Sequence, residues 1–141
     1  MPQNPDIAAA LQRFRLANAP ATNGVSWHVR ALMTEINESL FDQRLTVNTL
    51  KARCRIRDNN IAYHFKDETG VSIKEYIERL RIAAAGELLR SGNFNAWEVA
   101  HAVGYSHLQT FYRAFRRRFG CTPGDFRVRV KAPHEAVREA W

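Results

Sequence analysis

The sequence lacks the features that define several large classes of protein. It contains no run of about 18 apolar residues, so no segment is typical of a membrane-spanning helix. Residues 1–6 show no basic stretch leading into an apolar one, and we therefore expect no secretory signal and a cytoplasmic location. The two cysteines, Cys54 and Cys121, are far apart in the chain, which favours free thiols in a reducing compartment over a disulfide framework.

The sequence also lacks the residue groups on which enzymes depend. We find no nucleophile paired with a base, no cluster of metal ligands and no phosphate-binding loop. His101 and His107 do not share a helix face well, so they are not expected to bind a metal. We therefore predict that the chain is not an enzyme and that it uses no metal or other cofactor.

What the sequence does contain is enough apolar material for a core and an excess of positive charge. Of its 141 residues 45% are hydrophobic, and the net charge of +7 favours polyanionic partners. Residues 1–44 are neutral, whereas residues 45–92 carry +3 and residues 93–141 carry +4. Because the excess lies in two separate segments, we expect two contact surfaces rather than one basic tail.

Apolar residues recur at helical spacing along the chain, and strand-like alternation is weak and confined to residues 126–130. A first helix is predicted over residues 6–18, and it either packs on the rest of the protein or binds a partner. Residues 19–25 are typical of a linker. Ser26 is expected to cap a helix that runs to about Leu40, so the pattern indicates an all-α fold with an extra N-terminal helical arm.

A unit made of a short helix, a tight turn and a second helix occurs at about residues 46–69. Thr46 is expected to cap the short helix, and the turn falls at residues 55–57. Ile61 and Phe65 are one helical turn apart, which places both on the inner face of the second helix.

The same unit recurs at about residues 95–118. Asn95 and Glu98 form a predicted capping box for its short helix, and Ser106 is the expected cap of its second helix. Trp97, in the short helix, is expected to be partly buried, with an exposed surface for RNA polymerase as the alternative. The inner face of the second helix is predicted to carry large apolar side chains: Leu108, Phe111, Phe115 and Phe119.

A long helix is predicted between the two units. Ser72 and Glu75 form a predicted capping box at its start, and it is expected to run to about Arg90. Its length of roughly 28 Å is close to the ~34 Å that separates successive major-groove faces of DNA. Gly86 inside this helix indicates either close packing or a tolerated defect.

Three stretches of sequence match the signature of one protein family. They are AHAVGYS at residues 100–106, FYRAFRRRFGCTPGDFR at residues 111–127 and, in the first unit, FKDETG at residues 65–70. On these stretches the chain resembles the AraC/XylS family of bacterial transcription regulators over about residues 30–130. The resemblance implies a seven-helix fold of the homeodomain-like, AraC-type kind, with two helix-turn-helix units on an asymmetric DNA site. Some domains of this kind are fused to DNA repair activities.

The resemblance also implies which residues contact DNA. The implied base-reading residues are Asn59, Asn60 and Tyr63 in the first unit and Gln109, Thr110 and Arg113 in the second. The implied phosphate-binding residues are Arg57, Lys66, His107, Arg116 and Arg117. Asn and Gln suit adenine and Arg suits guanine, whereas phosphate contacts position a protein without specifying a sequence. The run of arginines at residues 116–118 has a simpler alternative, a solvated helix face.

Several residues depart from the family pattern in the first unit. Arg55 occupies a position that often holds a turn glycine, Asp58 and Asp67 add negative charge, and His64 replaces a residue that is usually apolar and inward-facing. We therefore expect the first unit to bind DNA more weakly than the second. Typical family members also carry a long N-terminal sensor or dimerisation domain, so the chain is either a stand-alone member or one that lacks its sensor.

Taken together, the sequence predicts a sequence-specific DNA-binding transcription regulator, an activator, in the bacterial nucleoid. The expected domains are an arm and linker at residues 1–25, the DNA-binding domain at residues 26–130 and a tail at residues 131–141. The expected partners are double-stranded DNA, bound as a monomer, and RNA polymerase, with a dimer through the arm left open. The alternative is a protein-binding co-regulator with weak DNA binding.

Overall fold

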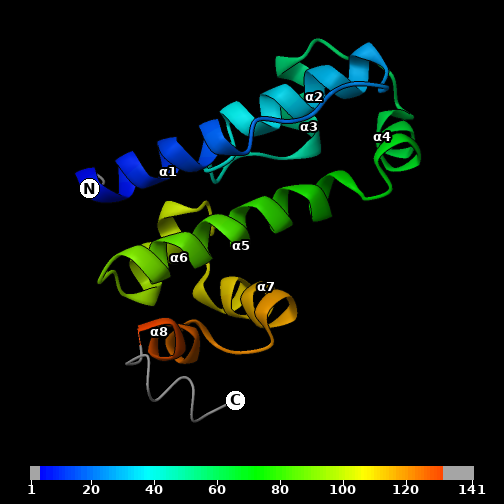
Figure 1. Ribbon diagram of the computed structural model, residues 1–141. Coiled ribbons are helices and arrows are strands. Elements are labelled where there is room, and N and C mark those ends of the chain that lie inside the picture. The colour runs from blue at the N-terminus through cyan, green and yellow to red at the C-terminus, as the bar shows by residue number, and fades with distance from the viewer. Residues whose placement is uncertain (1–3, 132–141) are drawn as a thin grey trace.

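A computed structural model describes residues 4–131, which form eight helices and no strand (Figure 1). The helices are α1 (Pro5–Ala17), α2 (Trp27–Glu38), α3 (Val47–Arg53), α4 (Ile61–Thr69), α5 (Ile73–Ser91), α6 (Ala96–Ala102), α7 (Leu108–Phe119) and α8 (Pro123–Lys131). The all-α prediction is therefore confirmed. The tail predicted at residues 131–141 lies, apart from Lys131, outside the described residues. Among the described residues, no helix is both long enough and apolar enough to cross a membrane.

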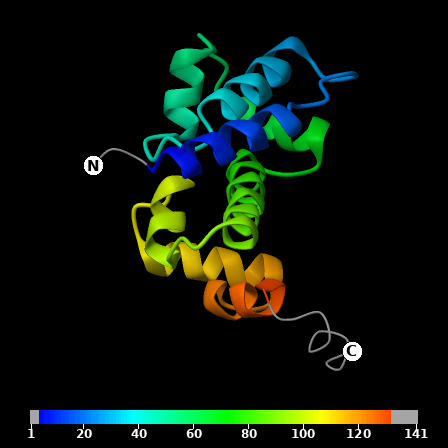
Figure 2. The same ribbon diagram turned by 60° about the vertical axis from the view of Figure 1, so that its left-hand side comes forward.

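Helix α5 lies in the middle of the molecule, with α2, α3 and α4 on one side and α6, α7 and α8 on the other (Figures 1 and 2). Each side has its own hydrophobic core, here called the first and the second core. Ile73 and Ile77 of α5 belong to the first core, whereas Ile82, Leu88 and Leu89 belong to the second. A single helix thus supplies one wall to each core.

The helix starts follow largely from their capping residues. Ser26 Oγ accepts a hydrogen bond from the Val29 N–H, and Thr46 forms a capping box with Thr49. Asn95 and Glu98 form the capping box expected from the sequence. These side chains satisfy backbone N–H groups that the first turn of a helix leaves without a partner.

Two local predictions were wrong. Ser72 accepts a hydrogen bond from the Glu75 N–H, but the Glu75 carboxylate pairs with Arg79 at 3.0 Å, so no reciprocal capping box forms. Helix α7 begins at Leu108 with His107 as its N-cap, so Ser106 is not the cap. Residues 126–130, where the sequence shows a weak strand-like alternation, form part of α8, because Thr122 caps that helix and α8 packs against α5.

The N-terminal helix α1 packs on the domain. Ile7 and Leu11 are buried in the second core, and Phe14 contacts both cores, with its ring 6.3 Å from that of Phe41. Arg15 Nη1 donates to the Glu38 carbonyl at 2.7 Å, which ties the end of α1 to the end of α2. Helix α1 therefore spans the two halves of the molecule.

Two predictions about packing are settled by the aromatic side chains. A Cβ on Gly86 would lie 2.9 Å from Phe119 Cζ, so this glycine allows close packing of α5 on α7 and is not a tolerated defect. Trp97 is 62% exposed and stacks on His101 at 5.3 Å, so the expectation of partial burial was wrong. Its position on the outer side of a short amphipathic helix accounts for this exposure.

Candidate nucleic-acid interface

The two helix-turn-helix units, α3 with α4 and α6 with α7, have the same backbone geometry at their turns. The Ile56 N–H donates to the Lys51 carbonyl at 2.9 Å, and the Tyr105 N–H donates to the Ala100 carbonyl at 2.9 Å. Arg55 in one turn and Gly104 in the other have positive φ angles of 55° and 105°. This pattern is a Schellman motif, in which a left-handed residue ends the first helix and reverses the chain.

The second helix of each unit is anchored by buried apolar side chains on its inner face. Ile61 and Phe65 of α4 are buried in the first core, and Phe111 and Phe115 of α7 are buried in the second. The rings of Phe115 and Phe119 lie 4.6 Å apart and extend this packing. In Figure 1, α4 and α7 both lie to the right of α6 and α8, toward the end at which α5 begins.

The predicted base-reading residues of the first unit are exposed at the start of α4. Asn60 is the N-cap of the helix, and Asn59 precedes it and accepts a hydrogen bond from Lys51 Nζ at 3.4 Å. Tyr63 is the third residue of the helix and is 68% exposed. The three side chains are thus brought to one end of α4 rather than along its length.

The predicted base-reading residues of the second unit are also exposed. Gln109 and Thr110 lie in the first turn of α7, and Arg113 follows one turn later. His107, predicted to contact phosphate, is the exposed N-cap of this helix. The two sets of residues therefore occupy comparable places in the two units.

The predicted phosphate-binding cations are exposed, and one of them is engaged within the protein. The guanidinium groups of Arg57 and Arg116 and the ammonium group of Lys66 have no hydrogen bond or ion pair within residues 4–131. Arg117, in contrast, donates through Nη1 to both carboxylate oxygens of Glu78 at 3.0 Å. This pair joins α7 to α5 and could not be inferred from local sequence.

The negative charges that depart from the family pattern are partly satisfied within the first unit. Asp58 accepts a hydrogen bond from the Asn60 N–H at 2.8 Å and lies 3.5 Å from His64 Nε2. The His64 side chain is 48% exposed. Ile61 and Phe65 make the buried stripe of this short helix, as predicted, and His64 lies outside it.

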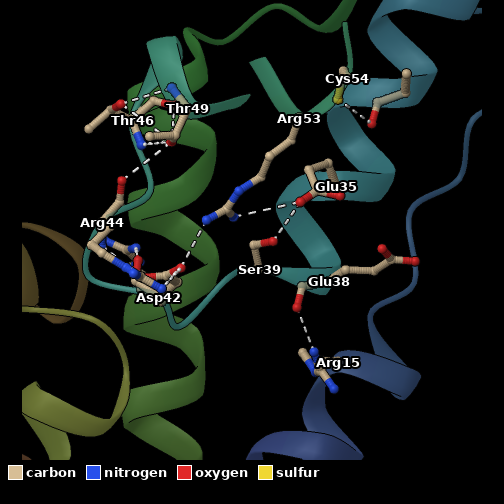
Figure 3. Close-up of polar contacts among 12 residues, drawn as sticks. Arg15, Glu35, Glu38, Ser39, Asp42, Arg44, Thr46, Thr49, Arg53 and Cys54 are labelled. Atoms are coloured by element: carbon tan, nitrogen blue, oxygen red, sulfur yellow. Dashed lines mark hydrogen bonds and ion pairs between the residues drawn. The ribbon is translucent and has the colours of Figure 1, made fainter. Parts of the chain in front are cut away.

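A network of charged residues fixes the short helix of the first unit to its surroundings (Figure 3). Arg53 of α3 reaches Asp42 at 3.1 Å and Glu35 of α2 at 3.6 Å. Hydrogen bonds from Arg44 and Arg53 hold the pKa of the Asp42 carboxyl well below its usual range. These residues have no local signature in the sequence, since their contacts join separate elements.

Two observations bear on metal and thiol chemistry in the described part of the chain. Nowhere in residues 4–131 do three or more His, Cys, Asp or Glu side chains gather so that they could hold a metal ion. Burial, together with the nearby Glu35 carboxylate, raises the pKa of the Cys54 thiol. The thiolate form of Cys54 is therefore less populated than in an ordinary exposed cysteine.

Comparison with known proteins agrees with this geometry. A helix-turn-helix domain family matches residues 50–129. The Msm operon regulatory protein of Streptococcus mutans is 26% identical over 125 residues, which cover 89% of this chain and 45% of that protein. The chain thus spans less than half the length of this relative.

Solved structures share the fold. The C-terminal domain of AraT, a response regulator from Geobacillus stearothermophilus, has a TM-score of 0.71 at 26% identity, covering 74% of this chain and 87% of that one. The DNA-binding domain of AdpA, a global transcriptional factor solved in complex with a target DNA, has a TM-score of 0.68 at 24% identity, covering 77% and 99%. The chain belongs to the AraC/XylS family of helix-turn-helix transcription regulators.

Proposed function

We propose that the protein is a sequence-specific regulator of transcription that inserts α4 and α7 into successive major grooves of one DNA duplex. The observation that carries this proposal is that each of these helices has one face of buried apolar side chains and an opposite face of exposed polar and cationic side chains. An α-helix fits the major groove, where each base pair presents its own pattern of donors and acceptors. Helix α5 has 19 residues and is about 28 Å long, which is comparable with the ~34 Å of one DNA turn.

Within this proposal the exposed side chains divide into two roles. The base-reading residues are Asn59, Asn60, Tyr63, Gln109, Thr110 and Arg113. The phosphate-binding residues are Arg57, Lys66, His107, Arg116 and Arg117. Amide and guanidinium groups can pair with base edges through two hydrogen bonds, whereas the remaining cations attract the backbone without regard to sequence.

We propose residues 26–130 as the DNA-binding domain, with residues 1–25 as an arm whose helix packs on it. The monomer contains two reading helices, so a second copy is not needed to contact two groove segments. We further propose that the protein acts as an activator in the bacterial nucleoid through contact with RNA polymerase. The exposed Trp97, stacked on His101, supports this proposal because large exposed aromatic side chains are frequent anchors of protein interfaces.

Selection of bound duplexes from a random DNA library tests the proposed function. We expect a single asymmetric site with two conserved segments about one helical turn apart. Titration of that site and of a scrambled duplex against salt then separates the two kinds of contact. A specific binder shows a steep log–log salt dependence and retains its preference for the selected site, whereas recovery of no enriched sequence contradicts the proposal.

The alternatives are less well supported by the structure. The alternative, a protein-binding co-regulator with weak DNA binding, rests on the charges of Asp58 and Asp67 and on the N-terminal arm. Asp58 accepts a hydrogen bond from the Asn60 N–H and lies 3.5 Å from His64 Nε2, and the arm packs on the domain through Ile7 and Leu11. We also propose that neither cysteine is catalytic. Cys121 is buried, and the pKa of the Cys54 thiol is raised. A thiol reagent that reacted unusually fast with the folded protein would contradict this.

A further inference from the structure

Arg81 of α5 is the one charged side chain that is buried in the described part of the chain. Burying a guanidinium group is costly unless its donors are satisfied, and burial lowers its pKa. Its environment therefore has to supply specific partners. These partners come from both halves of the molecule.

On the side of the first core, Arg81 binds the loop between α2 and α3. Its Nε donates to the Leu40 carbonyl at 2.8 Å, and its Nη2 donates to the Asp42 carbonyl at 2.7 Å. The Asp42 carboxylate is in turn bound by Arg53 of α3 (Figure 3). The guanidinium group is thus attached to the backbone just ahead of the first helix-turn-helix unit and, through Asp42, to α3.

On the side of the second core, Arg81 contacts the turn between α6 and α7. Its Cζ lies 5.8 Å from the centre of the Tyr105 ring, within the range of a cation–π interaction. A Cβ on Gly104 would lie 2.8 Å from the same Cζ, so the glycine leaves the space that the guanidinium group fills. Burial raises the pKa of Tyr105 to about 12, and the ring therefore stays neutral beside the arginine.

We propose that Arg81 is a positioning residue that fixes the second helix-turn-helix unit relative to the first and so sets the spacing of the two DNA segments that the protein selects. This inference rests on the proposed function, since spacing matters only if both units read DNA. Apolar contacts of α5 with the two cores are not directional. The planar guanidinium group, in contrast, binds two carbonyls and one ring face at defined angles.

The test uses the site obtained by selection, rebuilt as duplexes with zero, one or two base pairs added or removed between its two segments. Affinities are measured for the wild-type protein, Arg81→Met, Arg81→Lys and the control Arg79→Met. Arg79 lies two residues away on α5, is about half exposed and pairs only with Glu75. No hydrogen bond or ion pair joins it to either unit's turn within residues 4–131.

We expect the wild-type protein and Arg79→Met to lose about tenfold or more in affinity when two base pairs are added, because one unit then leaves its bases. In Arg81→Met this loss is expected to fall to about threefold or less, with weaker binding to the best duplex. Arg81→Lys should lie between them, since one ammonium group cannot reproduce the planar fork. An Arg81→Met protein that keeps the wild-type spacing profile overturns the inference, whatever its overall affinity.

Two further outcomes distinguish failure of the proposed function from failure of the Arg81 inference. If the wild-type protein binds all spacings equally, the proposed reading by two helices fails, independently of Arg81. If Arg81→Met does not fold, Tyr105→Leu takes its place, since it removes only the ring on the side of the second unit. It is expected to broaden the spacing profile in the same direction, and an unchanged profile in this variant contradicts the inference.

Discussion

Arg117 of α7 is bound to Glu78 of α5 through both oxygens of the carboxylate, at 3.0 Å each. The arginine is 67% exposed and lies on a helix whose other arginines face solvent. The pair therefore places a negative charge beside a surface that is proposed to meet phosphates. Glu78 reduces the charge that α7 offers to DNA and at the same time holds α7 against α5.

Replacing this carboxylate is expected to strengthen DNA binding. Glu78→Gln releases Arg117 for a phosphate, so the slope of log affinity against log salt should become steeper by about one. Loss of an exposed ion pair should cost only about 0–1 kcal/mol of folding stability. Glu75→Gln on the same helix is the control, because that carboxylate pairs with Arg79 and not with α7. An unchanged slope would show that Glu78 does not withhold Arg117 from a phosphate.

Substitution of two arginines on α7 should distinguish base contacts from phosphate contacts. Arg113→Ala is expected to cost about 1–3 kcal/mol on the selected site and to relax the preference at one base. Arg116→Ala should weaken binding to selected and scrambled duplexes by a similar factor, because phosphates are the same in both. Repeating the library selection with each variant makes the comparison direct. Equal losses on both duplexes for Arg113→Ala would contradict its assigned role.

Arg55→Gly is expected to stabilise the protein. Arg55 has a φ of 55°, a conformation that costs a residue with a Cβ about 1–2 kcal/mol, and glycine removes this cost while losing ~0.5–1 kcal/mol of chain entropy. The expected gain is therefore up to about 1.5 kcal/mol in the free energy of unfolding by urea. Gly104→Ala in the matching turn should destabilise, because its φ is 105° and the new Cβ meets Arg81. A destabilised Arg55→Gly protein would contradict the assignment of backbone strain to Arg55.

Stability should depend on pH through Asp42. Because the pKa of this carboxyl is lowered in the folded protein, its contribution is present above its unfolded pKa of about 3.9 and is lost as the pH falls through the folded pKa. The free energy of unfolding of the wild-type protein should therefore exceed that of Asp42→Asn near neutral pH. The difference should shrink progressively below pH ~4.

The matching control is Asp67→Asn, since Asp67 is exposed and has no hydrogen bond or ion pair within residues 4–131. Its difference from the wild-type protein should stay small across the same pH range. A difference for Asp42→Asn that does not change with pH would mean that its ion pairs contribute little in solution.

Sequence predicted the parts of this structure that depend on neighbours in the chain. Thr46 and Asn95 mark helix starts through their own side chains, and Phe111 and Phe115 share a helix face because of their spacing. Ser106 is of a residue type that often caps helices, but it lies one residue before the observed N-cap of α7, His107. The local pattern was sufficient to predict both units and the helix between them.

The remainder depends on contacts between distant positions. Arg81 meets Leu40 across 41 residues, and Arg117 meets Glu78 across 39. Neither pair has a spacing that a helix or turn would reveal. The exposure of Trp97 was also mispredicted, because burial is decided by which elements cover a helix and not by residue type alone.

Because α5 supplies a wall to both cores, neither half of the molecule has a complete interior without it. Unfolding of one half would expose apolar surface of the other, so heat or urea should unfold both halves in a single transition. Under the proposed function, altering the recognised DNA sequence requires changes only to exposed side chains on α4 or α7, which leave the interior untouched. Grafting half of the molecule onto a relative would have to bring the shared helix with it.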